Sequence, residues 1–197
     1  CYTIKPNIYG GWAAAAEDVP SAAMITGLGM VFTTPGPRRW LASRMLRKAC
    51  HHHDRIFFQN PNDRDDLLTS GVVADPSKAV LTAGSGVDLE SFSLQPLPER
   101  PVFLMLSRLL EAKGVRQYLK AAVKVKAACP DAIIRLGGME DPGSGGVPMS
   151  EIRAAESSGA VEYLGYVEDV HQALAECSVS VLPSWYGEGI PHSLLEG

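Results

Sequence analysis

Residues 102–114 read Val-Phe-Leu-Met-Leu-Ser-Arg-Leu-Leu-Glu-Ala-Lys-Gly. The run of consecutive apolar residues at its start is typical of a β-strand, and the turn that follows it is polar. Residues 115–128 then place apolar side chains at helical spacing. A strand followed by a turn and a helix predicts a βα unit of a parallel sheet.

The same alternation continues along the whole chain. Short apolar or β-branched runs are separated by stretches with a helical pattern. The expected strands lie at 22–25, 55–58, 79–82, 102–107, 132–136, 161–164 and 179–182. The fold class is therefore α/β with parallel sheets.

A proline-punctuated stretch at 88–100 interrupts the alternation and reads as a linker between two domains. We place the first domain at 1–94 and the second at 95–197. The chain begins with Cys1 and stops within what reads as a helix, so we expect a fragment. In this interpretation the first domain lacks its opening strands and the second lacks its closing helices.

Composition and charge exclude several classes of protein. The 197 residues are 46% hydrophobic and 20% charged, which is typical of a globular α/β protein. No apolar run approaches the roughly 20 residues that span a bilayer, and no signal-peptide pattern opens the chain, so we expect a cytoplasmic protein. The net charge of −4 argues against a nucleic-acid partner, because phosphate backbones require a basic face.

Arg108 and Lys113 follow the strand at 102–107. Ligands of open α/β sheets bind outside the carboxyl ends of the strands, so these two cations flank such a crevice. They can hold a diphosphate there, each charge-assisted bond contributing roughly 1.5 to 3 kcal/mol. Taken alone, a pair of this kind is more often solvated surface charge.

A second polar region follows the strand at 179–182. Pro191 stands where the first turn of a helix favours proline, and the free N–H groups of such a helix start form an anion site. Glu188 precedes it in a glycine-bearing loop, and Glu196 lies more than one turn beyond. The two carboxylates are therefore expected to address different ends of one long ligand, although as isolated acids they would be surface or capping residues.

Four segments together resemble, in order and spacing, family 4 of the retaining glycosyltransferases with the GT-B fold. They lie at 84–88, 107–114, 163–170 and 182–196. The resemblance implies two Rossmann-like domains, an incomplete acceptor-side domain and a truncated donor-binding domain. It implies transfer of a hexose or N-acetylhexosamine from a nucleotide diphosphate sugar, such as a UDP-sugar, without a metal or other cofactor.

The resemblance also implies roles for individual residues. Arg108 and Lys113 neutralise the donor diphosphate and the charge that grows on it during transfer. Glu188 contacts the donor sugar on its reacting face, and Glu196 accepts hydrogen bonds from the ribose. Glu188, Arg108 and Lys113 form the expected catalytic set. The other expected donor contacts are Gly137, Gly138, Tyr166, Val167, Gly189, Ile190, Pro191 and His192.

The first domain resembles the acceptor side of a subgroup that acts on precursors of cell-surface polysaccharides, such as lipopolysaccharide or capsule. The segments that carry this resemblance are 2–11, 25–29 and 57–61. They imply a saccharide or polyprenyl-linked acceptor. Many members of the family place a histidine near the position of Thr26, where this chain has Thr26 and Gly27, so that contact is not assigned.

Residues 37–53 carry basic side chains and apolar side chains on two different helical stripes. A basic amphipathic helix can rest on an anionic membrane surface, which would place the protein at the inner face of the plasma membrane. The alternative is that the apolar stripe packs on the sheet while the charges are solvated. The adjacent histidines at 51–53 cannot converge on one metal from a helix, so no metal site is expected.

Two other functions remain open at this level. A nucleotide-sugar epimerase has the same two-domain architecture but needs no acceptor, and a non-catalytic module would bind the sugar nucleotide without transfer. A dinucleotide oxidoreductase is disfavoured, because no GxGxxG follows a strand and opens a helix.

Overall fold

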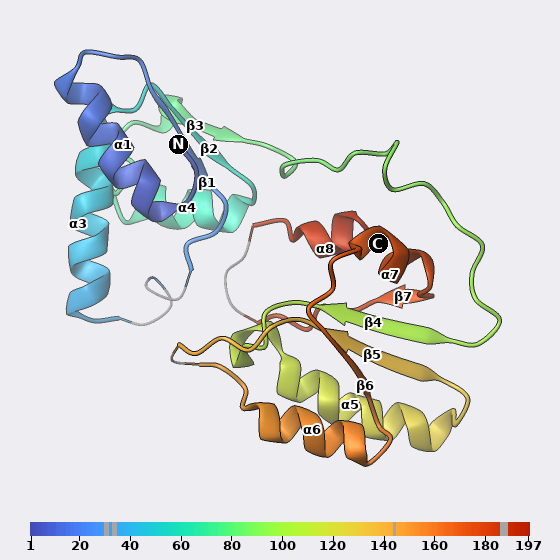
Figure 1. Cartoon of the computed structure of the whole chain (residues 1–197). Helices are drawn as coiled ribbons and strands as arrows, with labels where there is room; N and C mark the ends of the chain where they lie inside the picture. The colour runs from blue at the N-terminus through green and yellow to red at the C-terminus, as the bar shows by residue number, and fades with distance from the viewer. Residues whose placement is uncertain (30–31, 33–34, 144, 186–188) are drawn as a thin grey trace. The chain divides into compact units, whose positions relative to one another are not determined.

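The computed structural model describes residues 1–29, 32, 35–143, 145–185 and 189–197. The chain divides into two compact units (Figure 1). The first contains Cys1–Gly86 together with residues 189–191, and the second contains Val87–Trp185 and His192–Gly197. The division after Gly86 comes just before the linker that the sequence indicated at 88–100.

The first unit is built on a parallel sheet of three strands in the order β1-β2-β3. Its strands are β1 (Ala22–Ile25), β2 (Arg55–Phe58) and β3 (Ala79–Leu81). Its helices are α1 (Ile4–Ala16), α3 (Pro37–His52), α4 (Pro61–Thr69) and the 3₁₀ turn η1 (Pro76–Lys78). Ile25, Ile56 and Phe58 are fully buried and form the centre of its core.

Local signals explain where two of these helices begin. Proline occupies the first turn of both α3 and α4, where its missing N–H costs no hydrogen bond. At α4 the Asn60 side chain also accepts a hydrogen bond of 2.8 Å from the Asp63 N–H, which caps the helix. The Asn60-Pro61 pair, part of a segment that carried the acceptor-side resemblance, therefore has a structural role at this helix start.

The structure of α3 shows in part where the apolar stripe of residues 37–53 packs. Leu46, Ala49 and Cys50 are buried, so the central and C-terminal part of its apolar side packs into the core of the first unit. α1 lies alongside α3 in Figure 1. Trp40 and Leu41, near the start of α3, are 65% and 52% exposed, so they stay outside that core.

The second unit contains a parallel sheet in the order β6-β5-β4-β7. Its strands are β4 (Val102–Leu106), β5 (Ile133–Gly137), β6 (Glu162–Gly165) and β7 (Val179–Ser180). Its helices are η2 (Glu111–Lys113), α5 (Val115–Ala128), α6 (Met149–Ser157), α7 (Val170–Ala175) and α8 (His192–Leu195). α5 and α6 cover one face of this sheet (Figure 1).

Tyr118 of α5 ties this helix to the sheet. The aromatic ring is 4% exposed, and its hydroxyl lies 3.1 Å from the carbonyl oxygen of Phe103 and 3.0 Å from that of Arg135. These carbonyls belong to β4 and β5, so one buried donor serves two neighbouring strands. Burial raises the pKa of this phenol, which therefore remains a donor at neutral pH.

The α/β fold class predicted from the sequence is confirmed. α5 has the bounds that the helical pattern predicted, and β1 and β2 have the bounds of the predicted strands. The largest difference is β7, which pairs over Val179–Ser180 alone and ends before the predicted limit at 182. Among the described helices, none combines the length and the apolar character needed to cross a membrane.

A buried histidine joins three segments of the first unit. His53 is fully buried, its Nε2 lies 2.9 Å from the carbonyl oxygen of Asn7, and its Nδ1 lies 2.9 Å from the hydroxyl of Ser21. A carbonyl can only accept, so Nε2 carries the proton and Nδ1 accepts from Ser21. Burial lowers the pKa of His53, which keeps the ring neutral in the folded protein.

The first unit is predicted to lose stability as the pH falls through and below 6.5. The unfolded histidine, with its ordinary pKa near 6.5, binds a proton before the buried one does, so acid favours unfolding. Hydrogen exchange of the β1 and β2 amides between pH 7.5 and 5.5, corrected for the intrinsic exchange rate, measures this change. His53→Gln should cost about 2 kcal/mol at pH 7.5 and flatten the pH dependence.

The matched control is His52→Gln, because His52 is exposed on the same helix end. It should change the stability at pH 7.5 by less than about 0.5 kcal/mol. An equal pH dependence in the His53→Gln protein and the unaltered protein would contradict the assignment of the proton to this group.

Candidate functional site

Parallel pairing brings the ends of several strands of the second unit to one edge. The Ser107 N–H donates to the Gly137 carbonyl at 3.1 Å, just after β4. The Gly138 N–H donates to the Gly165 carbonyl at 2.7 Å, which joins the ends of β5 and β6. The segments that follow β4, β5 and β6 are therefore neighbours, and this edge is where ligands of open α/β sheets bind.

Gly137 and Gly138 allow these segments to approach closely. Gly138 has φ +150°, and a Cβ atom there would overlap the carbonyl oxygen of Ser107. A Cβ atom at Gly137 would come within 2.7 Å of the Val167 side chain and 2.6 Å of the Leu106 side chain. The two glycines, expected as donor contacts, thus have a packing role that applies with or without a ligand.

Arg108 is paired with a carboxylate that the sequence analysis did not single out. Its guanidinium Nη1 lies 2.9 Å from Oδ2 of Asp141, and the other carboxylate oxygen accepts the Gly143 N–H at 2.9 Å. The Arg108 side chain is 63% exposed, whereas that of Asp141 is 21% exposed. An exposed pair of this kind is weak, so an incoming anion can compete with Asp141 for the guanidinium.

Lys113 ends the 3₁₀ turn η2 and is half-buried. Gly114 follows it at φ +81°, and a Cβ atom there would overlap the Pro183 carbonyl. The indole Nε1 of Trp185 donates to the Glu111 carbonyl at 3.0 Å, and the Trp185 backbone N–H donates to the Ala112 carbonyl at 3.2 Å. The turn that carries Lys113 is therefore fastened to the segment after β7.

Tyr166 and Val167 follow β6 at the same edge. Tyr166 is 68% exposed, so its ring is available to a ligand. Val167 is half-buried and packs against Gly137. Together with Arg108, Lys113, Gly137 and Gly138, they form the part of the predicted set that the structure gathers at the edge of the β6-β5-β4-β7 sheet.

Glu196 and His192 belong to the last segment of the second unit. α8 spans only His192–Leu195, so Glu196 lies just past its end rather than within a helix. Nδ1 of His192 lies 3.7 Å from Oε1 of Glu196. A helix of one turn has little dipole, so the expected anion site at its start gains little from helix formation.

The four other predicted residues belong to the first unit or lie outside the described part. Gly189, Ile190 and Pro191 belong to the first unit. The Gly189 N–H donates to the Thr26 carbonyl at 2.9 Å, and the Ile190 side chain lies against Gly84. Glu188, the predicted contact of the donor sugar, lies outside the described residues.

Sequence reasoning missed Asp141 and Trp185. Asp141 lies in an Asp-Pro-Gly segment without a periodic pattern, and its partner Arg108 stands 33 positions earlier. Trp185 lies within the segment 182–196 that carries the family resemblance, but the resemblance implies no role for it. No local pattern pointed to the pairing of its indole N–H, because Trp185 is 65% exposed and its acceptor stands 74 positions earlier.

Over the described residues, no three His, Cys, Asp or Glu side chains are grouped closely enough to hold a metal ion. The expectation of a reaction without metal or cofactor therefore stays a prediction.

Comparison with known proteins shows that this chain is similar to glycosyltransferases. The family model described as glycosyl transferases group 1 matches residues 87–197. The chain is 25% identical over 211 residues to the N,N'-diacetylbacillosaminyl-diphospho-undecaprenol alpha-1,3-N-acetylgalactosaminyltransferase of Campylobacter jejuni, covering 98% of this chain and 54% of that protein.

Solved structures share the fold at low sequence identity. Alr3699/HepE of Anabaena in complex with UDP has a TM-score of 0.76 at 17% identity, covering 99% of this chain and 56% of that one. An α,α-trehalose 6-phosphate synthase from Burkholderia multivorans has a TM-score of 0.72 at 14% identity, covering 99% and 53%. The chain thus spans about half the length of these three proteins.

Gly138→Ala is predicted to destabilise the second unit by about 3 kcal/mol, through backbone strain and the overlap with the Ser107 carbonyl. Gly165→Ala is the matched control, because Gly165 also has a positive φ (+69°) but has open space around its Cβ position. It should cost only about 1 to 2 kcal/mol. Hydrogen exchange of the β4 and β5 amides measures both, and equal losses would refute the close-approach argument.

Proposed function

Because this chain belongs to the glycosyl transferases group 1 family, we propose that it takes part in the transfer of a hexose or N-acetylhexosamine from a UDP-sugar to a saccharide or polyprenyl-linked acceptor. The anomeric configuration of the sugar is retained, as in family 4. The product belongs to the biosynthesis of a cell-surface polysaccharide. The name of the Campylobacter jejuni relative supports this choice. It names a diphospho-undecaprenol-linked acceptor and the transfer of an N-acetylgalactosaminyl group.

The observation that carries the proposal is the position of Arg108 and Lys113 on the segment that follows β4. This segment lies beside the glycine pair at the end of β5, where the close backbone approach leaves no side chain between neighbouring strand ends. A diphosphate at this edge gains two charge-assisted contacts from the protein. Tyr166 offers an exposed ring for the base at the end of β6.

In the proposed reaction, the bond between the anomeric carbon and the diphosphate oxygen breaks, and the diphosphate leaves with the bonding electron pair. The acceptor hydroxyl oxygen forms the new bond to the anomeric carbon, and its proton passes to an oxygen of the leaving diphosphate. Arg108 and Lys113 stabilise the negative charge that grows on the leaving diphosphate. Glu188 contacts the donor sugar and Glu196 accepts hydrogen bonds from the ribose, as the family resemblance implies.

A polyprenyl-linked acceptor resides in a membrane, so the protein must approach the surface of that membrane. We assign this peripheral contact to α3 within residues 37–53. The buried apolar side of α3 is not available for it, because that side packs in the core. The contact instead uses the outward basic side chains together with the exposed Trp40 and Leu41.

Arg108→Ala and Lys113→Ala are each predicted to weaken UDP binding by about tenfold or more, because each removes one charge-assisted contact with the diphosphate. Calorimetric titration of the complete protein measures this effect. Lys124→Ala, on the exposed side of α5, is the control and should bind UDP within about twofold of the unaltered protein.

Transfer of the sugar from its UDP donor to an acceptor, measured in the same proteins, separates the alternatives. A transferase loses turnover in both variants and in Glu188→Ala. Unchanged turnover in all three would refute the assigned roles. Release of an altered sugar without an acceptor indicates an epimerase, and UDP binding without any turnover indicates a binding module.

Asp141→Asn is predicted to strengthen UDP binding by about two- to fivefold, because the diphosphate then no longer competes with the Asp141 carboxylate for the Arg108 guanidinium. The gain should shrink at high salt, where surface charges are screened. Titration with UDP at two salt concentrations measures it. Weaker binding in this variant would mean that Asp141 holds Arg108 in place for the ligand instead of competing with it.

A further inference from the structure

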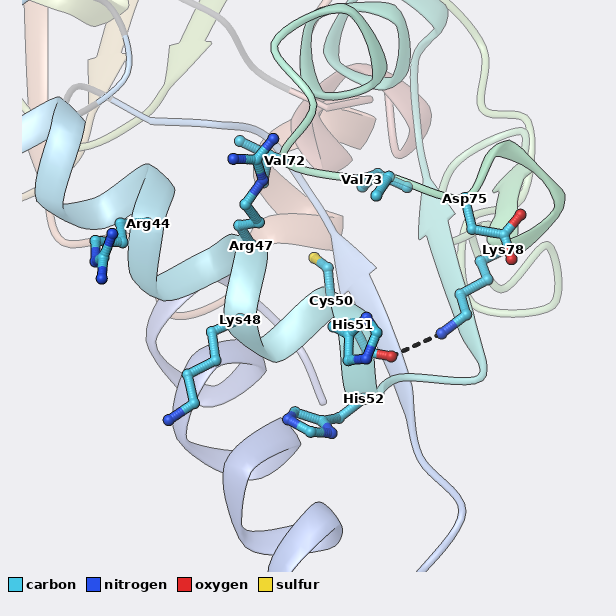
Figure 2. A pocket seen from close by; sticks show the side chains of 11 residues that line it. Arg44, Arg47, Lys48, Cys50, His51, His52, Val72, Val73, Asp75 and Lys78 are labelled. Carbon is cyan, nitrogen blue, oxygen red and sulfur yellow. Dashed lines mark hydrogen bonds between the residues drawn. The ribbon is translucent and has the colours of Figure 1, made fainter.

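A groove of about 590 Å³ lies in the first unit, between α3 and the segment that leads into β3 (Figure 2). One wall is formed by side chains of α3 at positions i, i+3, i+4 and i+7, which share one helical face. They are Arg44, Arg47, Lys48 and His51. The other wall is formed by residues 74–75 and Lys78.

The floor of this groove is apolar. Val72 and Val73 are 4% and 2% exposed, and Cys50 is 3% exposed. Burial raises the pKa of the Cys50 thiol to about 12, so the thiol is neutral and the floor carries no charge of its own. An occupant would therefore meet carbon and sulfur atoms at the base and charged groups at the walls.

The walls are mainly cationic. The lining holds four cationic side chains, Arg44, Arg47, Lys48 and Lys78, and one carboxylate, Asp75. Hydrogen bonds from Ser77 lower the pKa of Asp75, which keeps it ionised. The excess of positive charge is suited to an anion with more than one negative charge, such as a phosphate monoester.

Two of the cations are committed to the backbone, and two are available. Lys78 donates to the His51 carbonyl at 2.8 Å, as Figure 2 shows, and Arg47 donates to the Gly71 carbonyl at 2.6 Å. Within the described chain, Arg44 and Lys48 make only cation–π contacts. The Arg44 Cζ lies 5.9 Å from the centre of the Trp40 ring, and the Lys48 Nζ lies 5.5 Å from the centre of the Trp12 ring. Arg44 and Lys48 can therefore turn toward a ligand without losing a hydrogen bond.

We propose that this groove binds the phosphate head group of an anionic membrane lipid. The argument for a lipid rests on the exposed aromatic and apolar side chains beside the cations. Trp40 and Leu41 precede Arg44 by about one helical turn and are exposed, and Tyr9 of the adjacent helix α1 is 58% exposed. Rings of this kind favour the interface between head groups and acyl chains.

This inference rests on the membrane contact proposed above and makes it specific. General adsorption through charge needs no groove, and every basic residue near the surface contributes to it similarly. A head-group site instead requires the side chains that line one cavity. Arg38 and Arg39 lie on the same helix but do not line the groove, so they separate the two modes of binding.

The experiment compares two double variants of the complete protein. Arg44→Gln/Lys48→Gln removes two charges from the groove, and Arg38→Gln/Arg39→Gln removes two charges from the start of the same helix. Partition is measured by flotation with vesicles of phosphatidylcholine alone and of phosphatidylcholine mixed with phosphatidic acid. Circular dichroism checks that both variants are folded, and UDP affinity checks that the second unit is unaffected.

We expect the groove variant to lose about tenfold more affinity for phosphatidic acid vesicles than the control variant loses. Equal losses in the two variants would leave only charge-driven adsorption and overturn the head-group site. Binding of inorganic phosphate at the groove without any preference for vesicles that contain phosphatidic acid would overturn the lipid assignment in favour of a soluble phosphate. Absence of any vesicle binding would overturn both the groove and the membrane contact, while unchanged UDP affinity would leave the donor site standing.

Discussion

The parallel pairing of β4 with its two neighbours is the constraint on which the candidate site depends. Leu104 and Met105 are fully buried, so β4 cannot shift its register without exposing core side chains. With the register held, the carboxyl ends of β4 and β5 meet at one edge. The burial of β4 therefore determines where the segment that bears Arg108 and Lys113 lies.

Close approach of the backbone then determines the local shape of this edge. Gly114 and Gly138 lie where any Cβ atom would overlap a carbonyl oxygen of a neighbouring segment. Trp185 adds two hydrogen bonds to the turn of Lys113. Steric limits and backbone hydrogen bonds thus position the cations, while the exposed pair of Arg108 with Asp141 contributes little to stability and is open to exchange with a ligand.

In the first unit, the two sides of α3 have different surroundings. The inward side of α3 supplies Leu46 and Cys50 to the core, and its outward side presents cations to a groove. His53, at the end of this helix, joins α3 to α1 and to the residue before β1 through two hydrogen bonds. The groove is consequently supported by a packed and hydrogen-bonded base rather than by a free helix.

The sequence by itself determined the features that depend on local pattern. These include the α/β class, α5 from its apolar period, β1 and β2 from their apolar runs, and the place of Arg108 and Lys113 after a strand. Only the tertiary structure decided the partner of Arg108, the overlap that excludes a side chain at Gly138, and the groove beside α3. Each of these needs residues that are distant in the chain to meet, and periodicity within one segment carries no information about such a meeting.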